Sequence, residues 1–240
     1  GIDDLFFHVC FYLPATNLLV SLFFAKNRFM QIVVLGNDAY QKELVQDTTD
    51  NGVEVVWIAN INDFSVYEDA DAYIDLMFEN TAERKSLLKH LLPKPIIINS
   101  VIHTLKETDE NFIRIGAWPT FLQGAVVEGS CLLDDLKEKG ERVLKHFGKT
   151  VEWLPDVSGF ITPRVVSMII NEAHFALEEG VSTKAEIDTA MKLGTAYPHG
   201  PFEWSEKIGL HNIGALLQTL SKTQARYTPA PLLQKGLETF

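Results

Sequence analysis

The chain has 240 residues, 46% hydrophobic and 22% charged, which is typical of an ordinary globular protein with room for two modest domains. Its formal net charge of −11 argues against binding to nucleic acid or to an anionic membrane surface, because both are negative as well. Cys10 and Cys131 form neither a metal-binding pattern nor a disulfide framework, so we expect no metal site and a cytoplasmic location.

Residues 1–29 differ from the rest of the chain. The stretch 5–25 contains no charged residue and is rich in phenylalanine. However, Pro14 and several polar residues interrupt it, and the acidic Asp3 and Asp4 precede it, which is the wrong sign for a signal peptide. We interpret the segment as an apolar N-terminal extension. A packed or domain-swapped arm is the alternative, and a membrane anchor is the least favoured reading.

Residues 30–155 alternate between short apolar runs and helix-type patterns, which predicts βαβ units and a doubly wound parallel sheet. The fold class is therefore α/β, with a reduced Rossmann-like parallel sheet domain. The connection 60–70 is short for such a domain. The expected strands are 31–36, 53–58, 71–78, 96–99, the last strands within 112–128, and 150–154, and the expected helices are 39–49, 81–92 and 132–147.

Residues 156–240 are predicted to form an all-α C-terminal domain. Thr162-Pro163 is suited to begin a helix that Gly180 ends, and Thr183 with Glu186 has the spacing of a capping box. So small a set of amphipathic helices needs a partner surface, and we expect a homodimer through this domain. The predicted helices are 162–180, 183–194, 201–209 and 211–223.

A family resemblance runs through this helical part. The segments that carry it, between Asp156 and Leu210, are DVSGFITPR, NEAHFALEEGVS and IDTAMKLGTAYPHGPFEW. They resemble the C-terminal helical domain of the L-3-hydroxyacyl-CoA dehydrogenases. The resemblance implies a Rossmann-type domain before a dimerising helical domain, and NAD-dependent oxidation of a 3-hydroxyacyl-CoA to the 3-ketoacyl-CoA. It also implies an acyl-CoA-like small molecule as partner.

The cofactor loop departs from the dinucleotide-binding pattern. Such a loop needs glycines so that the backbone can turn tightly and approach the pyrophosphate at a helix N-terminus. Gly36 supplies the first glycine, but Asp38 and Gln41 occupy the second and third positions. Asp38 would repel the pyrophosphate and is expected to cap the helix itself. Ala59 replaces the acidic residue that would bind the ribose hydroxyls.

Two further positions correspond to cofactor-side residues of the family. Glu79 and Arg84 fall where the family has a glutamate and a lysine, although a solvated helix start explains them equally well. NAD is thus the cofactor by resemblance, and with Asp38, Gln41 and Ala59 in place we expect no cofactor to bind tightly.

The catalytic positions are also incomplete. Dehydrogenation of a 3-hydroxyl needs a base and a group that orients it. Glu128 matches the orienting glutamate of the family, and Ser100 lies near its substrate-binding serine. The family histidine is Trp118, which has no basic nitrogen, and the family asparagine is Pro163. His103 is a possible substitute base.

Two functions follow from this pattern. In the first, the chain is a 3-hydroxyacyl-CoA dehydrogenase-like protein with a degenerate cofactor loop and base, and is weak or inactive. In the second, it is a non-catalytic protein that binds an acyl-CoA-like ligand or acts as a dimeric interaction module. Fold alone does not choose between them, because function depends on the site.

Overall fold

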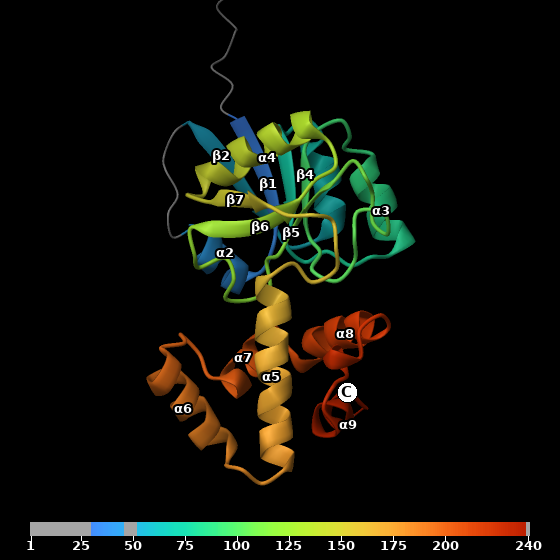
Figure 1. Ribbon diagram of the computed structural model, residues 1–240. Coiled ribbons are helices and arrows are strands. Elements are labelled where there is room, and N and C mark those ends of the chain that lie inside the picture. The colour runs from blue at the N-terminus through green and yellow to red at the C-terminus, as the bar shows by residue number, and fades with distance from the viewer. Residues whose placement is uncertain (1–29, 46–51, 239–240) are drawn as a thin grey trace, which may run out of the picture.

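A sheet domain followed by a helical domain makes up the part of the chain that the computed structural model describes, residues 30–45 and 52–238 (Figure 1). Within these residues seven strands form one sheet in the order β2-β1-β3-β4-β5-β6-β7. The interpretation of residues 1–29 lies outside the described residues, as does the expected end of the first helix. The strands are β1 (Met30–Leu35), β2 (Val53–Ile58), β3 (Ala72–Asp75), β4 (Ile96–Asn99), β5 (Ile113–Ile115), β6 (Val126–Ser130) and β7 (Thr150–Trp153).

The first five strands are parallel, as the βαβ alternation predicts. The last two are not: β6 runs antiparallel to β5, and β7 is parallel to β6. The sheet is therefore mostly parallel, as predicted, with one antiparallel pairing between β5 and β6. The segment between β5 and β6 contains no helix, and a connection without a crossover helix can join antiparallel neighbours.

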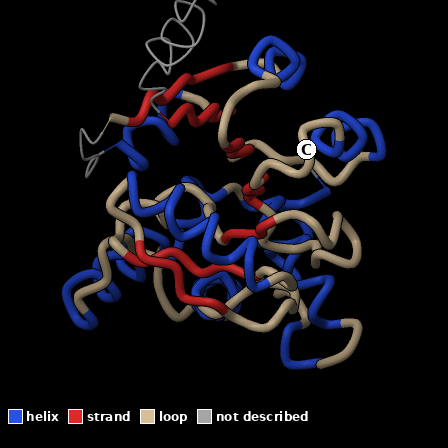
Figure 2. Tube along the Cα trace, turned by 90° about the horizontal axis from the view of Figure 1, so that it is seen from above, coloured by secondary structure: helices blue, strands red, loops and turns tan. Residues whose placement is uncertain are grey.

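Helices cover both faces of the sheet, as the view from above also shows (Figure 2). Alternate residues of β1 explain why: Ile32 and Val34 pack towards α2 and α4, whereas Val33 and Leu35 pack towards α3, and all four are buried. The elements around the sheet are α2 (Asp38–Leu44), a 3-10 helix η2 (Ile61–Tyr67), α3 (Ala82–Lys89) and α4 (Asp134–His146).

The helical domain follows the predicted boundaries closely. Thr183 and Glu186 form the expected capping box, and Gly180 has a φ of 71° directly after α5. The second helix runs one residue past Gly194, and Ala196 then takes the left-handed conformation, with a φ of 57°. The helices are α5 (Thr162–Glu178), α6 (Lys184–Thr195), α7 (Pro201–Ile208), α8 (Leu210–Ser221), a 3-10 turn η3 (Ala225–Tyr227) and α9 (Pro231–Glu238).

A buried arginine holds the connection between the two domains. Arg114 on β5 is fully buried and donates hydrogen bonds to the carbonyls of His103 (2.8 Å) and Val157 (2.7 Å). Its Nε lies 3.3 Å from Asp156, and its guanidinium lies over the ring of Phe160, 4.2 Å from the centroid. Burial lowers the pKa of Arg114 to about 10. The predicted domain boundary, between 155 and 156, falls in this segment between β7 and α5.

Candidate functional site

The turn after β1 is closed by a side-chain cap. The Asn37 side chain accepts hydrogen bonds from the backbone N–H groups of Ala39 and Tyr40, both at 3.1 Å. Asp38 is the first residue of α2, so the expectation that Asp38 caps this helix is wrong. Asn37 thus satisfies two of the N–H groups that an anion at a helix N-terminus would need. Asp38 adds a negative charge at the same end.

Side chains also fill the space beside Gly36. A Cβ on this glycine would lie 3.0 Å from the Trp57 ring and 3.4 Å from the Tyr40 Cβ. Ala59 is exposed and offers no hydrogen-bonding side chain, and the neighbouring Asn60 caps η2. Together with the Asn37 cap, these contacts leave little room and few free donors at the turn after β1.

Arg84 is held by a residue that sequence reasoning missed. Asp75, at the end of β3, is fully buried and receives two hydrogen bonds from Arg84, at 2.8 and 2.7 Å. Arg84 also donates to the Met77 carbonyl at 3.0 Å, while Glu79 is exposed. Burial raises the pKa of Asp75, and the Arg84 guanidinium opposes that shift. Arg84 therefore fixes the loop after β3 rather than projecting freely towards a cofactor.

Ser100 and its neighbour Asn99 lie at the carboxyl end of β4. The Ser100 hydroxyl donates to the His103 carbonyl at 2.9 Å. Asn99, which sequence reasoning passed over, donates to the Tyr40 hydroxyl (3.2 Å) and to the carbonyls of Leu76 and Ala117 (both 3.0 Å). Burial raises the pKa of Tyr40 to about 12, so its hydroxyl stays protonated. Asn99 could have been noticed as a polar residue that ends a buried strand at the ligand-binding edge of an α/β sheet.

These groups line a cavity of about 270 Å³. Tyr40, Ser100, His103 and Trp118 all contribute to its wall, with Asn212 from the helical domain. His103 is exposed. The cavity therefore brings Ser100 and the possible substitute base His103 together, but Glu128 does not line it.

Trp118 is a packing residue. It is 5% exposed and belongs to the core of the helical domain, together with Val166 and Trp204. Its ring lies near that of Phe121, with 6.1 Å between centroids. Trp118, predicted to stand at the position of the family base, thus packs as a large apolar side chain between the two domains.

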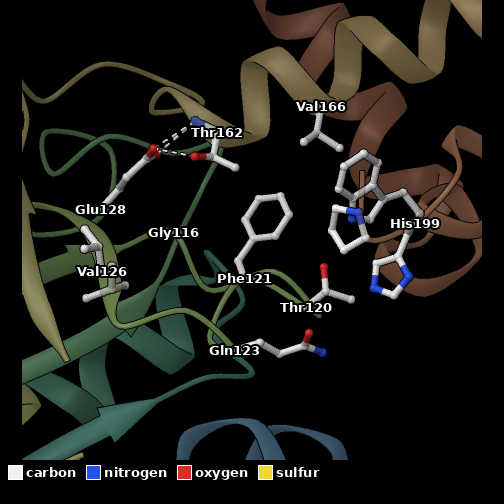
Figure 3. Close-up of a pocket in the computed structure, with 12 residues that line it drawn as sticks. Gly116, Thr120, Phe121, Gln123, Val126, Glu128, Thr162, Val166 and His199 are labelled. Carbon is white, nitrogen blue, oxygen red and sulfur yellow. Dashed lines mark hydrogen bonds between the residues drawn. The ribbon is translucent and has the colours of Figure 1, made fainter. Parts of the chain in front are cut away.

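Glu128 lies in a second cavity between the domains, of about 260 Å³ (Figure 3). Its carboxylate accepts hydrogen bonds from the Thr162 N–H (2.9 Å) and hydroxyl (2.6 Å) and from the Ile161 N–H (3.0 Å). Glu128 therefore caps α5 from another domain, whereas the sequence pattern assigned that cap to Thr162. Pro163 is buried in the first turn of α5.

His199 faces the same cavity from the helical domain, on the far side of Phe121 from Glu128 (Figure 3). Burial lowers the pKa of His199, and its Nε2 makes no hydrogen bond within the described residues. In that part of the chain no group of His, Cys, Asp and Glu side chains could hold a metal ion. None of the described helices is long and apolar enough to cross a membrane.

Comparison of the chain with known proteins identifies its family. Residues 159–239 match the C-terminal domain of 3-hydroxyacyl-CoA dehydrogenase. The chain is 30% identical over 184 residues to a 3-hydroxybutyryl-CoA dehydrogenase of Bradyrhizobium diazoefficiens, covering 68% of this chain and 63% of that one. The chain belongs to the 3-hydroxyacyl-CoA dehydrogenase family.

Two further members of this family extend the comparison. The chain is 41% identical over 104 residues to the 3-hydroxyadipyl-CoA dehydrogenase of Escherichia coli K12, covering 42% of this chain and 22% of that one. It shares the fold of the (S)-3-hydroxybutyryl-CoA dehydrogenase from Ralstonia eutropha, with a TM-score of 0.67, 21% identity, and 88% and 94% of the two chains covered. The matched part spans less than two thirds of the length of the Bradyrhizobium and Escherichia relatives.

Membership of the 3-hydroxyacyl-CoA dehydrogenase family gives meaning to the separation of the two cavities. Ser100 and Glu128, which the resemblance predicts to be catalytic positions, line different cavities. Trp118, predicted to stand at the position of the base, lines the cavity of Ser100. The structure therefore does not bring the predicted site residues together around one shared space.

Proposed function

We propose that this chain is a 3-hydroxyacyl-CoA dehydrogenase homologue that has lost tight NAD binding and the base of the family reaction. That reaction is the NAD-dependent oxidation of a 3-hydroxyacyl-CoA to the 3-ketoacyl-CoA, and an acyl-CoA-like small molecule is the ligand class that the resemblance implies. The hydrogen bonds from Ala39 and Tyr40 to Asn37 carry the proposal, because they use the donors that a pyrophosphate would need.

The catalytic positions support the same proposal. An indole can donate a hydrogen bond but cannot take a proton, so Trp118 cannot replace a histidine base. A positioned base typically contributes 10²–10⁴-fold to the rate. Glu128 would have no imidazole to orient, and its carboxylate is already bonded to Thr162. Any remaining oxidation would need His103 as the base.

NADH titration followed by fluorescence tests the first half of this proposal. We expect no saturation at micromolar NADH and no oxidation of 3-hydroxybutyryl-CoA above background. The variant Asn37→Ala/Asp38→Gly/Ala59→Asp should gain at least tenfold in NADH affinity, because it frees two N–H groups, removes a like charge and restores a ribose acceptor. Lys42→Ala, an exposed residue of α2 outside the glycine pattern, is the matched control and should gain nothing.

Turnover tests the second half. In the triple variant, oxidation of 3-hydroxybutyryl-CoA should appear only after Trp118→His is added. Unmodified protein that saturates with micromolar NADH and turns over at ordinary dehydrogenase rates would contradict the proposal. In that case His103→Gln should abolish the activity, since His103 is the alternative base.

We also infer that the chain forms a homodimer through its helical domain. The outer face of α5 borders an apolar groove of about 780 Å³. Val157, Ile161 and Val165 on this groove are 46%, 55% and 52% exposed. Contiguous exposed apolar surface of this kind marks an interaction site. We also propose a cytoplasmic location. The buried Cys131, which forms no disulfide among the residues that the structure describes, supports it.

A further inference from the structure

A cavity of about 520 Å³, open to solvent, is formed by α5, α6, α7 and α8 of the helical domain. It shares no lining residue with either interdomain cavity. Its volume is within the range of small-molecule sites, roughly 300–1,000 Å³. Phe202 and Leu210 give it apolar walls. The family reaction described above uses none of its residues.

A buried imidazole in this wall has one free nitrogen. His174 is only 7% exposed, and its Nδ1 lies 2.8 Å from the Ile170 carbonyl, one turn back along α5. A carbonyl can only accept, so Nδ1 carries the proton and Nε2 is left as an acceptor that points away from the helix backbone. Nε2 makes no hydrogen bond within the described residues. The ring packs against Phe202, with 5.0 Å between centroids.

The cavity also has a free cation. The Lys184 Nζ lies 5.4 Å from the centroid of the Phe202 ring and forms no ion pair within the described part of the chain. Leu210, the first residue of the 12-residue helix α8, also lines the cavity. The first turn of such a helix leaves N–H groups without intrahelical partners and carries positive potential. Lys184 and the start of α8 together favour a carboxylate.

A free carboxylate lies on the same wall. Glu206 on α7 is exposed and has no ion-pair partner among the described residues. Glu206 and the Nε2 of His174 are both acceptors, and neither is satisfied by the protein. A ligand group that carries several N–H donors and a positive charge would satisfy both.

We propose that this cavity binds an apolar amino acid in its zwitterionic form. Lys184 and the start of α8 bind the carboxylate, and His174 Nε2 and Glu206 bind the ammonium. Phe202 and Leu210 contact the apolar side chain. The proposal goes beyond the proposed function and does not depend on it.

Calorimetric titration of the full chain with L-leucine and L-phenylalanine is the test. Two analogues test the two charged groups of the ligand separately. 4-Methylpentanoate has the leucine side chain and carboxylate without the ammonium, and 3-methylbutylamine has the ammonium without the carboxylate. We expect saturable binding of at least one amino acid and at least tenfold weaker binding of both analogues, because each loses a charge-assisted hydrogen bond. No binding of either amino acid, or equal binding of an analogue, would overturn the proposal.

Two surface variants locate the site. Lys184→Met should weaken L-leucine binding at least tenfold. Glu206→Gln should also weaken L-leucine binding, and it should reduce the ratio of the affinity for L-leucine to the affinity for 4-methylpentanoate. Both side chains are exposed, so neither change should affect folding. Lys222→Met, at the opposite end of α8, is the control and should bind like the unmodified chain. Unchanged binding in both cavity variants would overturn the assignment to this cavity.

Discussion

The Glu128 carboxylate on β6 holds the first turn of α5 through Thr162, although 34 residues separate the two in the chain. The hydroxyl of Thr162 donates at 2.6 Å and its N–H at 2.9 Å. A side chain from the sheet domain thus does what a local N-cap residue does in most helices. Glu128, which we predicted to be the family's orienting glutamate, thus forms a contact between the two domains.

Replacing Glu128 should therefore cost stability. Glu128→Ala removes the acceptor from the N–H groups of Ile161 and Thr162, and loss of an N-cap typically costs about 0.5–2 kcal/mol. Urea denaturation should show a loss in that range. Glu152→Ala, an exposed glutamate on the adjacent β7, is the matched control and should change the free energy of unfolding by less than about 0.5 kcal/mol. Equal effects of the two changes would contradict the capping role.

Replacing one member of the Arg114–Asp156 pair should cost more stability than replacing Glu128. Arg114→Met leaves Asp156 without its cation and removes two hydrogen bonds to the connection between the domains. Breaking a buried pair from one side typically costs about 3–5 kcal/mol. Lys139→Met, which breaks the exposed Lys139–Asp135 pair, should cost less than about 1 kcal/mol. Chemical denaturation of the two variants measures the difference, and a loss below about 1 kcal/mol for Arg114→Met would refute it.

Two histidines should make the protein less stable in mild acid. Burial lowers the pKa of His174, with a smaller effect in the same direction from Lys184, and burial also lowers the pKa of His199. The unfolded chain, whose histidines have a pKa of about 6.5, then binds more protons than the folded chain. Their contribution to stability is therefore fully present above about pH 6.5 and is lost as the pH falls towards the folded pKa values.

His174→Phe should reduce this pH dependence, because it removes one of the two groups. Free energies of unfolding measured between pH 7 and pH 5 should fall less steeply in the variant, with the remaining slope due to His199 and the carboxylates. His90→Gln, at an exposed histidine after α3, serves as the control and should keep the original slope. An unaltered slope in His174→Phe would show that His174 does not contribute.

If the dimer forms through the apolar outer face of α5, a charge introduced on that face should weaken it. Val165→Glu places a charge in the groove, and burying an unpaired charge opposes association. We expect light scattering to show a dimer for the unmodified chain at micromolar concentration and a monomer for the variant. Val181→Glu introduces the same charge at a residue that is 69% exposed and outside the groove, and it should remain dimeric. A monomeric unmodified chain would remove the basis of this inference.

Some features follow from the sequence because the interactions behind them are local. The Thr183–Glu186 capping box joins residues three apart, and the short apolar run of β1 specifies a buried strand without reference to other segments. The helix-type spacing after Pro163 likewise predicts α5. These patterns predicted the order of strands and helices and the existence of a helical domain.

Other local expectations failed because two neighbouring residues could each make the same contact. Asn37 and Asp38 are both good N-cap residues, and only the backbone direction at the end of β1 selects Asn37. The helix predicted over 132–147 begins two residues later, at Asp134, with Leu133 as its N-cap. The sequence pattern does not settle such choices to within one residue.

The site itself was decided by tertiary structure. The sequence predicts that Trp118 stands where the family has its base, but only the packing of the two domains shows that its ring is buried in the helical core. Asp75 with Arg84, Asn99 with Tyr40, and Glu128 with Thr162 pair residues from different strands and helices. Hydrophobic periodicity specifies which face of each element is buried, but not which distant side chain it will meet. That depends on how the strands and helices pack together, and it determines the contacts around Glu128 and His174.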